Sequence, residues 1–160
     1  MNDPPDHGTC QNAVDIVDIV ADARERPSET FSTLEHRPDV AVTVATLEFG
    51  DYSIAGQVAF ERKTAEDLAR SIIDGRLFRQ MSKLRRLADR PVLLVEGLEP
   101  QTAPSGVSWP AVRGALVSVA VVFGVPVLMA VSAHESAEMI VAAGRQLARA
   151  TSLGYARPGC

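Results

Sequence analysis

The sequence is poor in the residues on which disulfide-rich and zinc-binding domains depend. Its 160 residues include two cysteines, Cys10 and Cys160, near opposite ends of the chain and without metal-binding or redox spacing. The three histidines have no partners at ligand spacing either, so we expect them to lie on the surface. Free thiols are the simpler interpretation of the cysteines, and they indicate a reducing, cytoplasmic setting.

The sequence also lacks a signal peptide and a glycine-rich phosphate loop. Residues 1–10 are polar, which argues against secretion, and the missing phosphate loop argues against a nucleotide-binding regulator. The uncharged stretch 114–133 has the length of about one membrane span. Gly124 and Pro126 interrupt it, so we expect a buried helix, a turn and a buried strand there instead of a membrane segment.

What the chain does contain is typical of one compact α/β domain. Apolar residues make up 46% of the chain, and short β-branched runs alternate with segments of helical periodicity. This alternation predicts a mixed sheet covered by helices on both faces. We expect strands at 14–22, 40–49, 91–97 and 125–131, and a hairpin over 51–61 that turns at Ala55 and Gly56. We expect helices at 27–37, 64–74, 76–88, 110–123 and about 132–150.

Basic residues gather in one segment, although the whole chain has a net charge of −4. The segment 62–90 holds nine of the sixteen basic residues and four acidic ones, a local balance of +5. Local fields decide where a polyanion docks, so this segment indicates a nucleic-acid-binding face. A solvated helix surface remains the alternative interpretation for its arginines.

Two acids and a lysine are expected to share one face of the hairpin and its continuation. Asp51 opens the first strand, Glu61 closes the second, and Lys63 follows at a two-residue spacing that points it the same way as Glu61. Neighbouring carboxylates repel each other unless a divalent cation bridges them. The three residues thus predict a metal-dependent phosphodiesterase site, whereas Arg62 would point away, toward a helix or a second phosphate.

Each of these residues also has a purely structural interpretation. The triplet 61–63 would be an exposed ion pair at a strand end, and Glu25 would pair on the surface with the arginine before or after it. Asp67 is the third residue after Thr64, where it would cap a helix. Such a cap is compatible with a place in an active site.

Four motifs occur in a fixed order: DARE at 22–25, GDY at 50–52, ERKTAEDL at 61–68 and DGRLFRQ at 74–80. Together they resemble the nuclease domain of the XPF family of structure-specific endonucleases, within the PD-(D/E)XK superfamily. The hallmark ERKxxxD of that family is filled without a departure, and the resemblance covers about residues 16–150. It implies a restriction-endonuclease-like fold, with a mixed central sheet flanked by helices on both faces.

The resemblance also implies a metal-dependent DNA endonuclease. It would cut one strand of branched DNA, such as a 3′ flap or a fork, near a single-strand/double-strand junction. Mg²⁺ or Mn²⁺ would be held by Asp22, Asp51 and Glu61, with the backbone carbonyl of Arg62 beside them. The catalytic set implied is Asp22, Glu25, Asp51, Glu61, Arg62, Lys63 and Asp67. The residues implied to face the DNA backbone are Arg76, Arg79, Gln80 and Lys83.

The family usually forms dimers and usually carries a tandem helix–hairpin–helix domain after the nuclease domain. We therefore expect a homodimer through the apolar C-terminal half, in the cytoplasm and at the nucleoid in a prokaryote. We expect a flexible leader at 1–13, the nuclease domain at 14–150 and a tail at 151–160, which leaves no room for the helix–hairpin–helix domain. The alternative function is a catalytically silent, nuclease-like scaffold for dimerisation or DNA docking. A silent relative would normally lose Asp51, Glu61 or Lys63, and all three are present.

Overall fold

Six strands form one mixed sheet in the computed structural model, which describes residues 15–155. The predicted leader and the second half of the predicted tail lie outside the described residues. The strand order across the sheet is β2-β1-β3-β4-β5-β6. The strands are β1 (Val17–Asp22), β2 (Val40–Ala45), β3 (Tyr52–Ile54), β4 (Val58–Thr64), β5 (Arg90–Glu96) and β6 (Val127–Ala130).

A tight hairpin at the centre makes the sheet mixed. β3 pairs antiparallel with β1 and with β4, whereas the other neighbouring strands pair in parallel. Ala55 and Gly56 turn the hairpin with φ angles of 52° and 63°, the left-handed conformation of the two central residues of a type I′ turn, and the Gln57 N–H donates to the Ile54 carbonyl at 2.9 Å. The predicted hairpin and its turn are confirmed.

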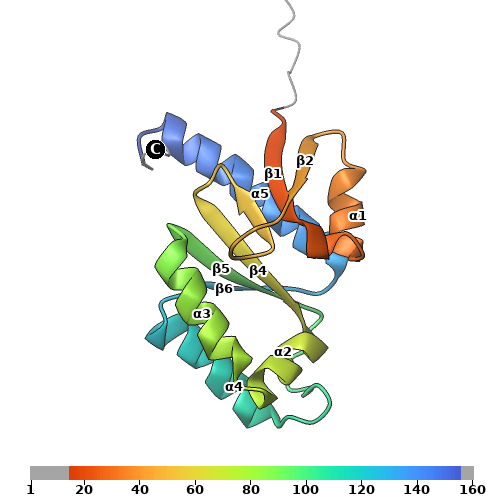
Figure 1. Ribbon diagram of the computed structural model, residues 1–160, viewed down its shortest axis with the longest axis vertical. Helices are drawn as coiled ribbons and strands as arrows, with labels where there is room; N and C mark the ends of the chain where they lie inside the picture. The colour runs from red at the N-terminus through yellow and green to blue at the C-terminus, as the bar shows by residue number, and fades with distance from the viewer. Residues whose placement is uncertain (1–14, 156–160) are drawn as a thin grey trace, which may run out of the picture.

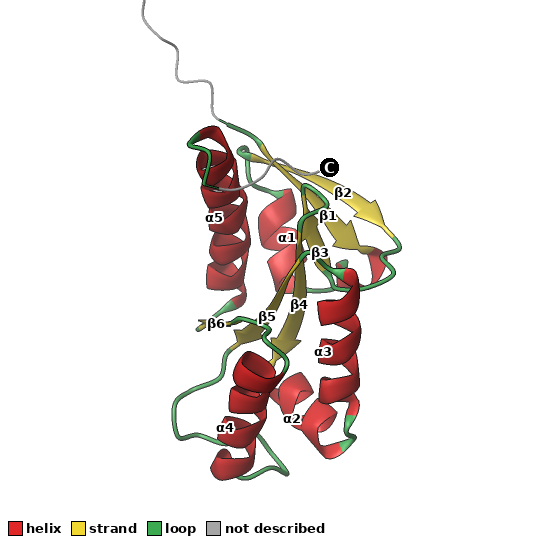
Figure 2. Ribbon diagram, turned by 90° about the vertical axis from the view of Figure 1, so that its left-hand side faces the viewer, coloured by secondary structure: helices red, strands yellow, loops and turns green. Residues whose placement is uncertain are grey.

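Helices cover both faces of this sheet, which confirms the predicted α/β architecture (Figure 1, Figure 2). On one face, Leu34 and Ile140 from two helices pack with Phe60 of the hairpin. On the other face, Met81 packs with Leu93 of β5. The helices of the first face are α1 (Glu29–Glu35) and α5 (Ala133–Ser152), and those of the second are α2 (Ala65–Ile73), α3 (Arg76–Leu87) and α4 (Trp109–Val117).

Local signals set the boundaries of the two basic helices. The Thr64 hydroxyl accepts a hydrogen bond from the Asp67 backbone N–H at 3.2 Å, so Thr64 caps α2 as predicted. Gly75 separates α2 from α3 in the left-handed conformation, with φ 66°. Glycine is the residue that adopts this conformation without strain, which is why the chain turns between the two helices there.

Three predicted details of the strands were wrong. β2 ends at Ala45 rather than 49, because the chain leaves the sheet and the Leu47 N–H bonds the Asp22 carboxylate instead. β4 runs on to Thr64, because it stays paired with β5 over that length. The predicted buried strand 125–131 is the edge strand β6, in which Met129 is 43% exposed, since no described strand pairs with its outer side.

The uncharged stretch 114–133 divides into separate short elements. α4 ends at Val117, a π-helical turn occupies Ser118–Val122, and β6 follows after Gly124. Among the described residues, no helix combines the length and apolar character that crossing a membrane would require. Several valines of this region are exposed, namely Val117, Val121, Val122 and Val131.

Candidate active site

Three acidic residues lie in a row across neighbouring strands. Asp22 ends β1, Asp51 precedes β3 and Glu61 lies in β4. The Asp22 N–H donates to the Asp51 carbonyl at 2.8 Å, and the Asp51 N–H donates to the Phe60 carbonyl at 2.6 Å. These bonds extend the strand pairing by one step, so the three residues occupy adjacent positions at one end of the sheet.

Lys63 completes this row on the same face. Its Nζ lies 3.4 Å from Glu61 Oε1, and its side chain is buried. The backbone N–H of Arg62 donates to Asp51 Oδ2 at 2.8 Å, which holds the Asp51 side chain against β4. The structure therefore brings Asp51, Glu61 and Lys63 together, as the two-residue spacing along β4 predicts.

Asp51 and Glu61 lie close enough for their negative charges to repel each other when no cation is bound. Burial, followed by the neighbouring Glu61 carboxylate, raises the pKa of Asp51 from 3.8 to about 7. The Arg62 N–H and Lys63 counteract this shift in part. A divalent cation is the ligand that such a pair accommodates, because its charge compensates both carboxylates at once. Asp51 and Glu61 therefore fit a metal site by their chemistry.

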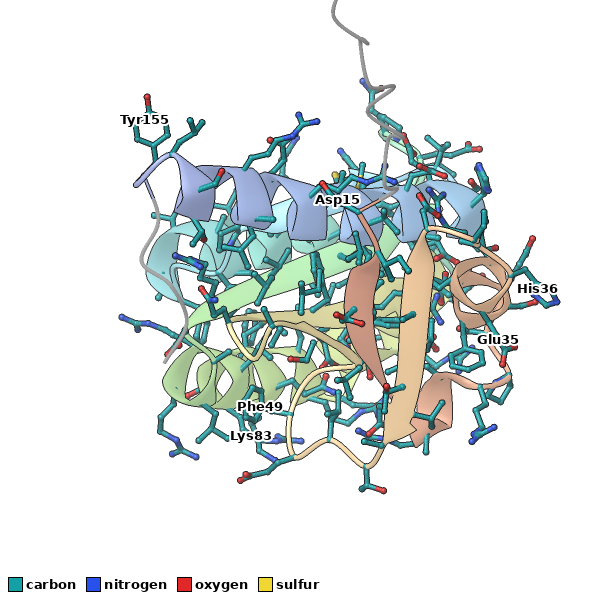
Figure 3. All side chains as sticks on the ribbon, turned by 90° about the horizontal axis from the view of Figure 1, so that it is seen from above. Asp15, Glu35, His36, Phe49, Lys83 and Tyr155 are labelled. Atoms are coloured by element: carbon teal, nitrogen blue, oxygen red, sulfur yellow. The ribbon has the colours of Figure 1, made fainter. Side chains whose placement is uncertain are left out.

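A pocket of about 150 Å³ opens beside these two carboxylates. Figure 3 labels two of its lining residues, Phe49 and Lys83, which lie close to one another at this end of the molecule. Lys83 Nζ donates to the backbone carbonyl of Glu48, another lining residue, at 2.7 Å. The full lining consists of Arg24, Glu48, Phe49, Gly50, Asp51, Glu61, Gln80, Lys83 and Leu84.

Asp22 differs from the other two acids in the row. Its Oδ1 accepts hydrogen bonds from the Arg24 Nε–H at 2.6 Å and the Arg24 backbone N–H at 2.9 Å, and its Oδ2 accepts from the Leu47 N–H at 2.8 Å. The bond from the Arg24 side chain is the main reason that the pKa of Asp22 falls to about 2. Among residues 15–155, no three His, Cys, Asp or Glu side chains are grouped to hold a metal ion. The part of Asp22 in metal binding stays a prediction.

Arg62 lies on the opposite face of β4, within a buried polar network. Its Nε–H donates to Glu25 Oε2 at 2.8 Å, and its Nη1–H donates to Glu96 Oε2 at 3.1 Å. Glu25 Oε2 also accepts from the Tyr52 hydroxyl at 2.9 Å. The alternative interpretation of Glu25 as the partner of an adjacent arginine is wrong, because its ion pair is with Arg62, 37 positions away.

The sequence did not single out Glu96, although it holds this network together. Its Oε2 accepts from Arg62, from the Thr30 hydroxyl at 2.9 Å and from the Ser136 hydroxyl at 2.7 Å. One carboxylate oxygen thus joins β4 and β5 to α1 and α5. An acid that ends a fully apolar strand was the available signal, since such a residue is exposed or paired.

Asp67 lies at the start of α2, 53% exposed along its side chain. Its Oδ2 accepts from the Thr64 hydroxyl at 3.0 Å, and its Oδ1 lies 3.5 Å from Arg70 Nη1. Thr64, and not the Asp67 carboxylate, therefore accepts the hydrogen bond from a backbone N–H at the start of α2, so the prediction that Asp67 itself caps the helix amides is wrong. The proposed catalytic part of Asp67 stays a prediction.

The four residues predicted to face DNA all lie on α3, but they differ in surroundings. Gln80 donates through Nε2 to Glu61 Oε1 at 3.0 Å, and its Oε1 is buried without a hydrogen-bond partner among the described residues. Gln80 therefore belongs to the carboxylate pocket, with Lys83 at its rim. Arg76 and Arg79 are exposed, and Arg76 Nη2 lies 3.0 Å from Asp74 Oδ2.

Known proteins share this domain. The family described as the ERCC4 domain matches residues 21–143. The chain belongs to this family, as an XPF-type nuclease domain. Over 125 residues, or 78% of the chain, it is 33% identical to the 3′-flap repair endonuclease Xpf of Saccharolobus solfataricus. It is 36% identical, over the same share of the chain, to a Methanocaldococcus jannaschii protein named as an ATP-dependent RNA helicase, MJ1505.

Solved XPF structures have the same fold. The structure of XPF from Aeropyrum pernix in complex with DNA is similar over 83% of this chain, with a TM-score of 0.75 and 28% identity. The chain spans 53% of the Saccharolobus relative, 15% of the Methanocaldococcus relative and 66% of the Aeropyrum chain. The restriction-endonuclease-like architecture implied by the ERK motif is confirmed by this likeness.

Proposed function

We propose that this ERCC4 domain is a divalent-metal-dependent DNA endonuclease that cuts one strand of branched DNA near a single-strand/double-strand junction. The ion pair of Lys63 with Glu61, and the interaction of both charges with the buried Asp51 carboxyl, carry the proposal. The name of the Saccharolobus relative, a 3′-flap repair endonuclease, supports a 3′ flap as substrate, and the Aeropyrum complex supports DNA as the ligand.

Asp51 and Glu61 would hold Mg²⁺ or Mn²⁺, with the backbone carbonyl of Arg62 nearby. A cation there would supply Lewis acidity toward the phosphate and would lower the pKa of water, so that a hydroxide nucleophile is available near neutral pH. Lys63 contributes an ammonium group beside Glu61, where it positions the attacking water and balances the charge of the carboxylates. Gln80 fixes the orientation of Glu61 through its 3.0 Å hydrogen bond.

Arg62 acts as a positioning residue in this mechanism. It occupies the reverse face of the strand that carries Glu61 and Lys63, and it is tied to Glu25 and Glu96 there. These ion pairs hold β4 in position and so keep the side chains of Glu61 and Lys63 in place. This matters because small displacements of catalytic groups lower rates strongly.

The decisive test is cleavage of a labelled 3′-flap DNA in Mg²⁺ or Mn²⁺ by the wild type and by Asp51→Ala and Lys63→Ala. We expect both variants to lose activity by at least about 100-fold, since each removes a group of the reacting site. Asp18→Ala, which alters an exposed acid at the far end of β1, is the matched control and should cleave normally. Activity that survives both site variants would rule out the proposed site.

A scaffold without catalysis is the second candidate, and the state of Asp22 favours it. Both oxygens of the Asp22 carboxylate already accept hydrogen bonds, from the Arg24 side chain and from the Leu47 N–H. A scaffold would bind the flap DNA with the same affinity in EDTA and in Mg²⁺. It would leave the DNA uncut in Mg²⁺ and in Mn²⁺.

We further propose a homodimer formed through the apolar C-terminal half, acting in the cytoplasm. Val121, Val122 and Val131 are 75%, 70% and 83% exposed, and association would remove these side chains from water. Sedimentation at micromolar concentration should show twice the 17.1 kDa chain mass, and Val121→Glu should reduce it to the monomer. A wild-type monomer at that concentration would contradict the proposal.

A further inference from the structure

A second pocket lies on the outer side of α3, next to the carboxylate pocket. It is a shallow depression, open to solvent, with a volume of about 400 Å³. Two aromatic rings, Phe78 and Phe123, form part of its wall and stack at a centroid distance of 5.7 Å with 6° between their planes. The lining consists of Phe78, Arg79, Ser82, Lys83, Arg86 and Phe123.

Two local features of the chain create this wall. Phe78, Ser82 and Arg86 follow one another at four-residue spacing, so they share one face of α3. Phe123 is placed by the π-helical turn after α4, in which its N–H donates to the Ser118 carbonyl at 3.0 Å. π-helical turns are rare, and many of those known occur at functional sites.

The charge of the pocket suits a polyanion. Its lining contains three cations and no acid, and α3 as a whole has five basic residues and no acidic one. Lys83 lines both this pocket and the one beside Asp51 and Glu61. A strand whose backbone follows α3 would therefore pass from the aromatic wall to the carboxylates without leaving the basic surface.

We propose that this pocket binds one unpaired nucleotide of the DNA substrate, with its base stacked on Phe78 and its flanking phosphates held by Arg79 and Arg86. The inference rests on the proposed function and adds to it the position of the single strand. Phe78 is 36% exposed, so part of its apolar surface is free to contact a base. Stacking on aromatic side chains is the common way in which proteins bind single strands regardless of sequence.

Unpaired bases are the specific occupants because the bases of a duplex already stack on each other. A nucleotide in the pocket would set the single-stranded arm of a flap on the α3 side of the carboxylates. The junction would then lie at Asp51 and Glu61, which gives a physical reason for cutting beside it.

Binding without cleavage tests this inference separately from the nuclease proposal. Fluorescence anisotropy in EDTA would compare two labelled single strands of about 12 nucleotides, oligo(dT) and an abasic strand with the same phosphates. We expect Phe78→Ala to weaken binding of oligo(dT) about tenfold, as loss of one stacked base predicts, and to leave the abasic strand unaffected. Phe78→Tyr, which keeps an aromatic ring, should bind oligo(dT) as the wild type does.

Leu87→Ala and Arg85→Ala are matched controls on the same helix. Leu87 is also 36% exposed but does not line the pocket, and Arg85 lies outside the pocket beside Arg86. Arg86→Ala should weaken both strands, whereas Arg85→Ala should weaken them less.

Three results would overturn the inference. The first is an unchanged affinity of Phe78→Ala for oligo(dT). The second is an equal loss for oligo(dT) and the abasic strand. The third is a wild-type dimer that Phe78→Ala converts to a monomer in sedimentation, which would assign this wall to a second copy of the chain. Because no cleavage is measured, failure of the nuclease proposal would leave these readouts intact.

Discussion

At the scale of single residues, the alternation of side chains along β4 separates two kinds of charge. Glu61 and Lys63 face the pocket, while Arg62 faces the network with Glu25 and Glu96 on the reverse side. Arg62 is 11% exposed along its side chain and serves two carboxylates at once. A guanidinium suits this position because its planar fork presents several N–H donors in fixed directions.

Replacement of Arg62 by lysine should therefore be costly, although the charge is kept. Arg62→Lys leaves at least one of the two buried carboxylates with a missing donor, so we expect a loss of about 1–3 kcal/mol in the free energy of unfolding. Urea denaturation measures this directly. Arg70→Lys, in the exposed pair with Asp67, is the control and should change stability by less than about 0.5 kcal/mol. Equal losses in the two variants would show that Arg62 has no special structural part.

At the scale of elements, α5 lies unusually close to the first strand of the sheet. A Cβ atom added at Gly144 would lie 2.5 Å from Val17 Cγ1, well inside van der Waals contact. The absence of a side chain at this position is what lets the helix approach β1. Gly114 of α4 offers the contrast, since a Cβ there would meet nothing within 4 Å.

The two alanine substitutions at these glycines should have opposite effects. Gly144→Ala should destabilise the domain by about 1–3 kcal/mol, because α5 or Val17 must move. Gly114→Ala should stabilise it by about 0.5–1 kcal/mol, because alanine is the better helix former. Thermal unfolding of both variants gives the comparison. A Gly144→Ala protein as stable as the wild type would mean that the helix can shift at no cost.

An ion pair between the start of β2 and α5 should make stability depend on pH. Asp39, just before β2, accepts hydrogen bonds from Arg37 at 2.8 and 2.9 Å and pairs with Arg145 of α5. The hydrogen bonds from Arg37 are the main reason that the pKa of Asp39 falls from 3.8 to about 2. Because the folded carboxyl is the stronger acid, its contribution to stability is complete above about pH 4 and disappears as the pH falls toward 2.

Asp39→Asn should remove this part of the acid dependence. We expect the variant to be less stable than the wild type at neutral pH, and the difference to shrink toward about pH 2. Denaturation curves between about pH 2 and pH 7 provide the test, with Asp18→Asn on the exposed side of β1 as the control. A stability difference that is the same at every pH would count against the ion pair.

At the scale of the whole molecule, a chain with net charge −4 presents one strongly basic helix. α3 carries all its charge in five basic residues, and the carboxylate pocket lies at its side. This separation of charge lets an acidic protein approach a polyanion from one direction.

Substitution of exposed arginines on α3 should therefore change the salt dependence of DNA binding. Arg76→Ala and Arg79→Ala should each weaken flap binding and reduce the slope of log affinity against log salt by about one unit for each phosphate that the arginine neutralises. Arg149→Ala on α5 should leave the slope unchanged. If the α3 variants retain the wild-type slope, their arginines are solvated rather than bound to phosphates.

Much of the fold and part of the site followed from local patterns in the sequence. The hairpin at Ala55 and Gly56, the cap at Thr64 and the break at Gly75 were all predictable, because each depends on the conformational preferences of one or two residues. The grouping of Asp51, Glu61 and Lys63 was predictable for a similar reason. Hairpin pairing and the two-residue period of a strand fix which side chains share a face.

Other features were decided by contacts between distant parts of the chain. Ser136 and Glu96 are 40 positions apart, Gln80 and Glu61 are 19 apart, and no local pattern relates them. The edge position of β6 likewise depends on which strands pair, not on its apolar sequence.

The sequence by itself thus determined most of the elements, the grouping of Asp51, Glu61 and Lys63, and through its motifs the family. Tertiary structure alone decided the hydrogen-bond partners around these groups. Arg62 donates to Glu25 on the reverse face of β4, Arg24 donates to Asp22, and Gln80 donates to Glu61. The physical reason is that turns, caps and strand periodicity act within a few residues. Burial and the pairing of charges arise only when the whole sheet and its helices assemble.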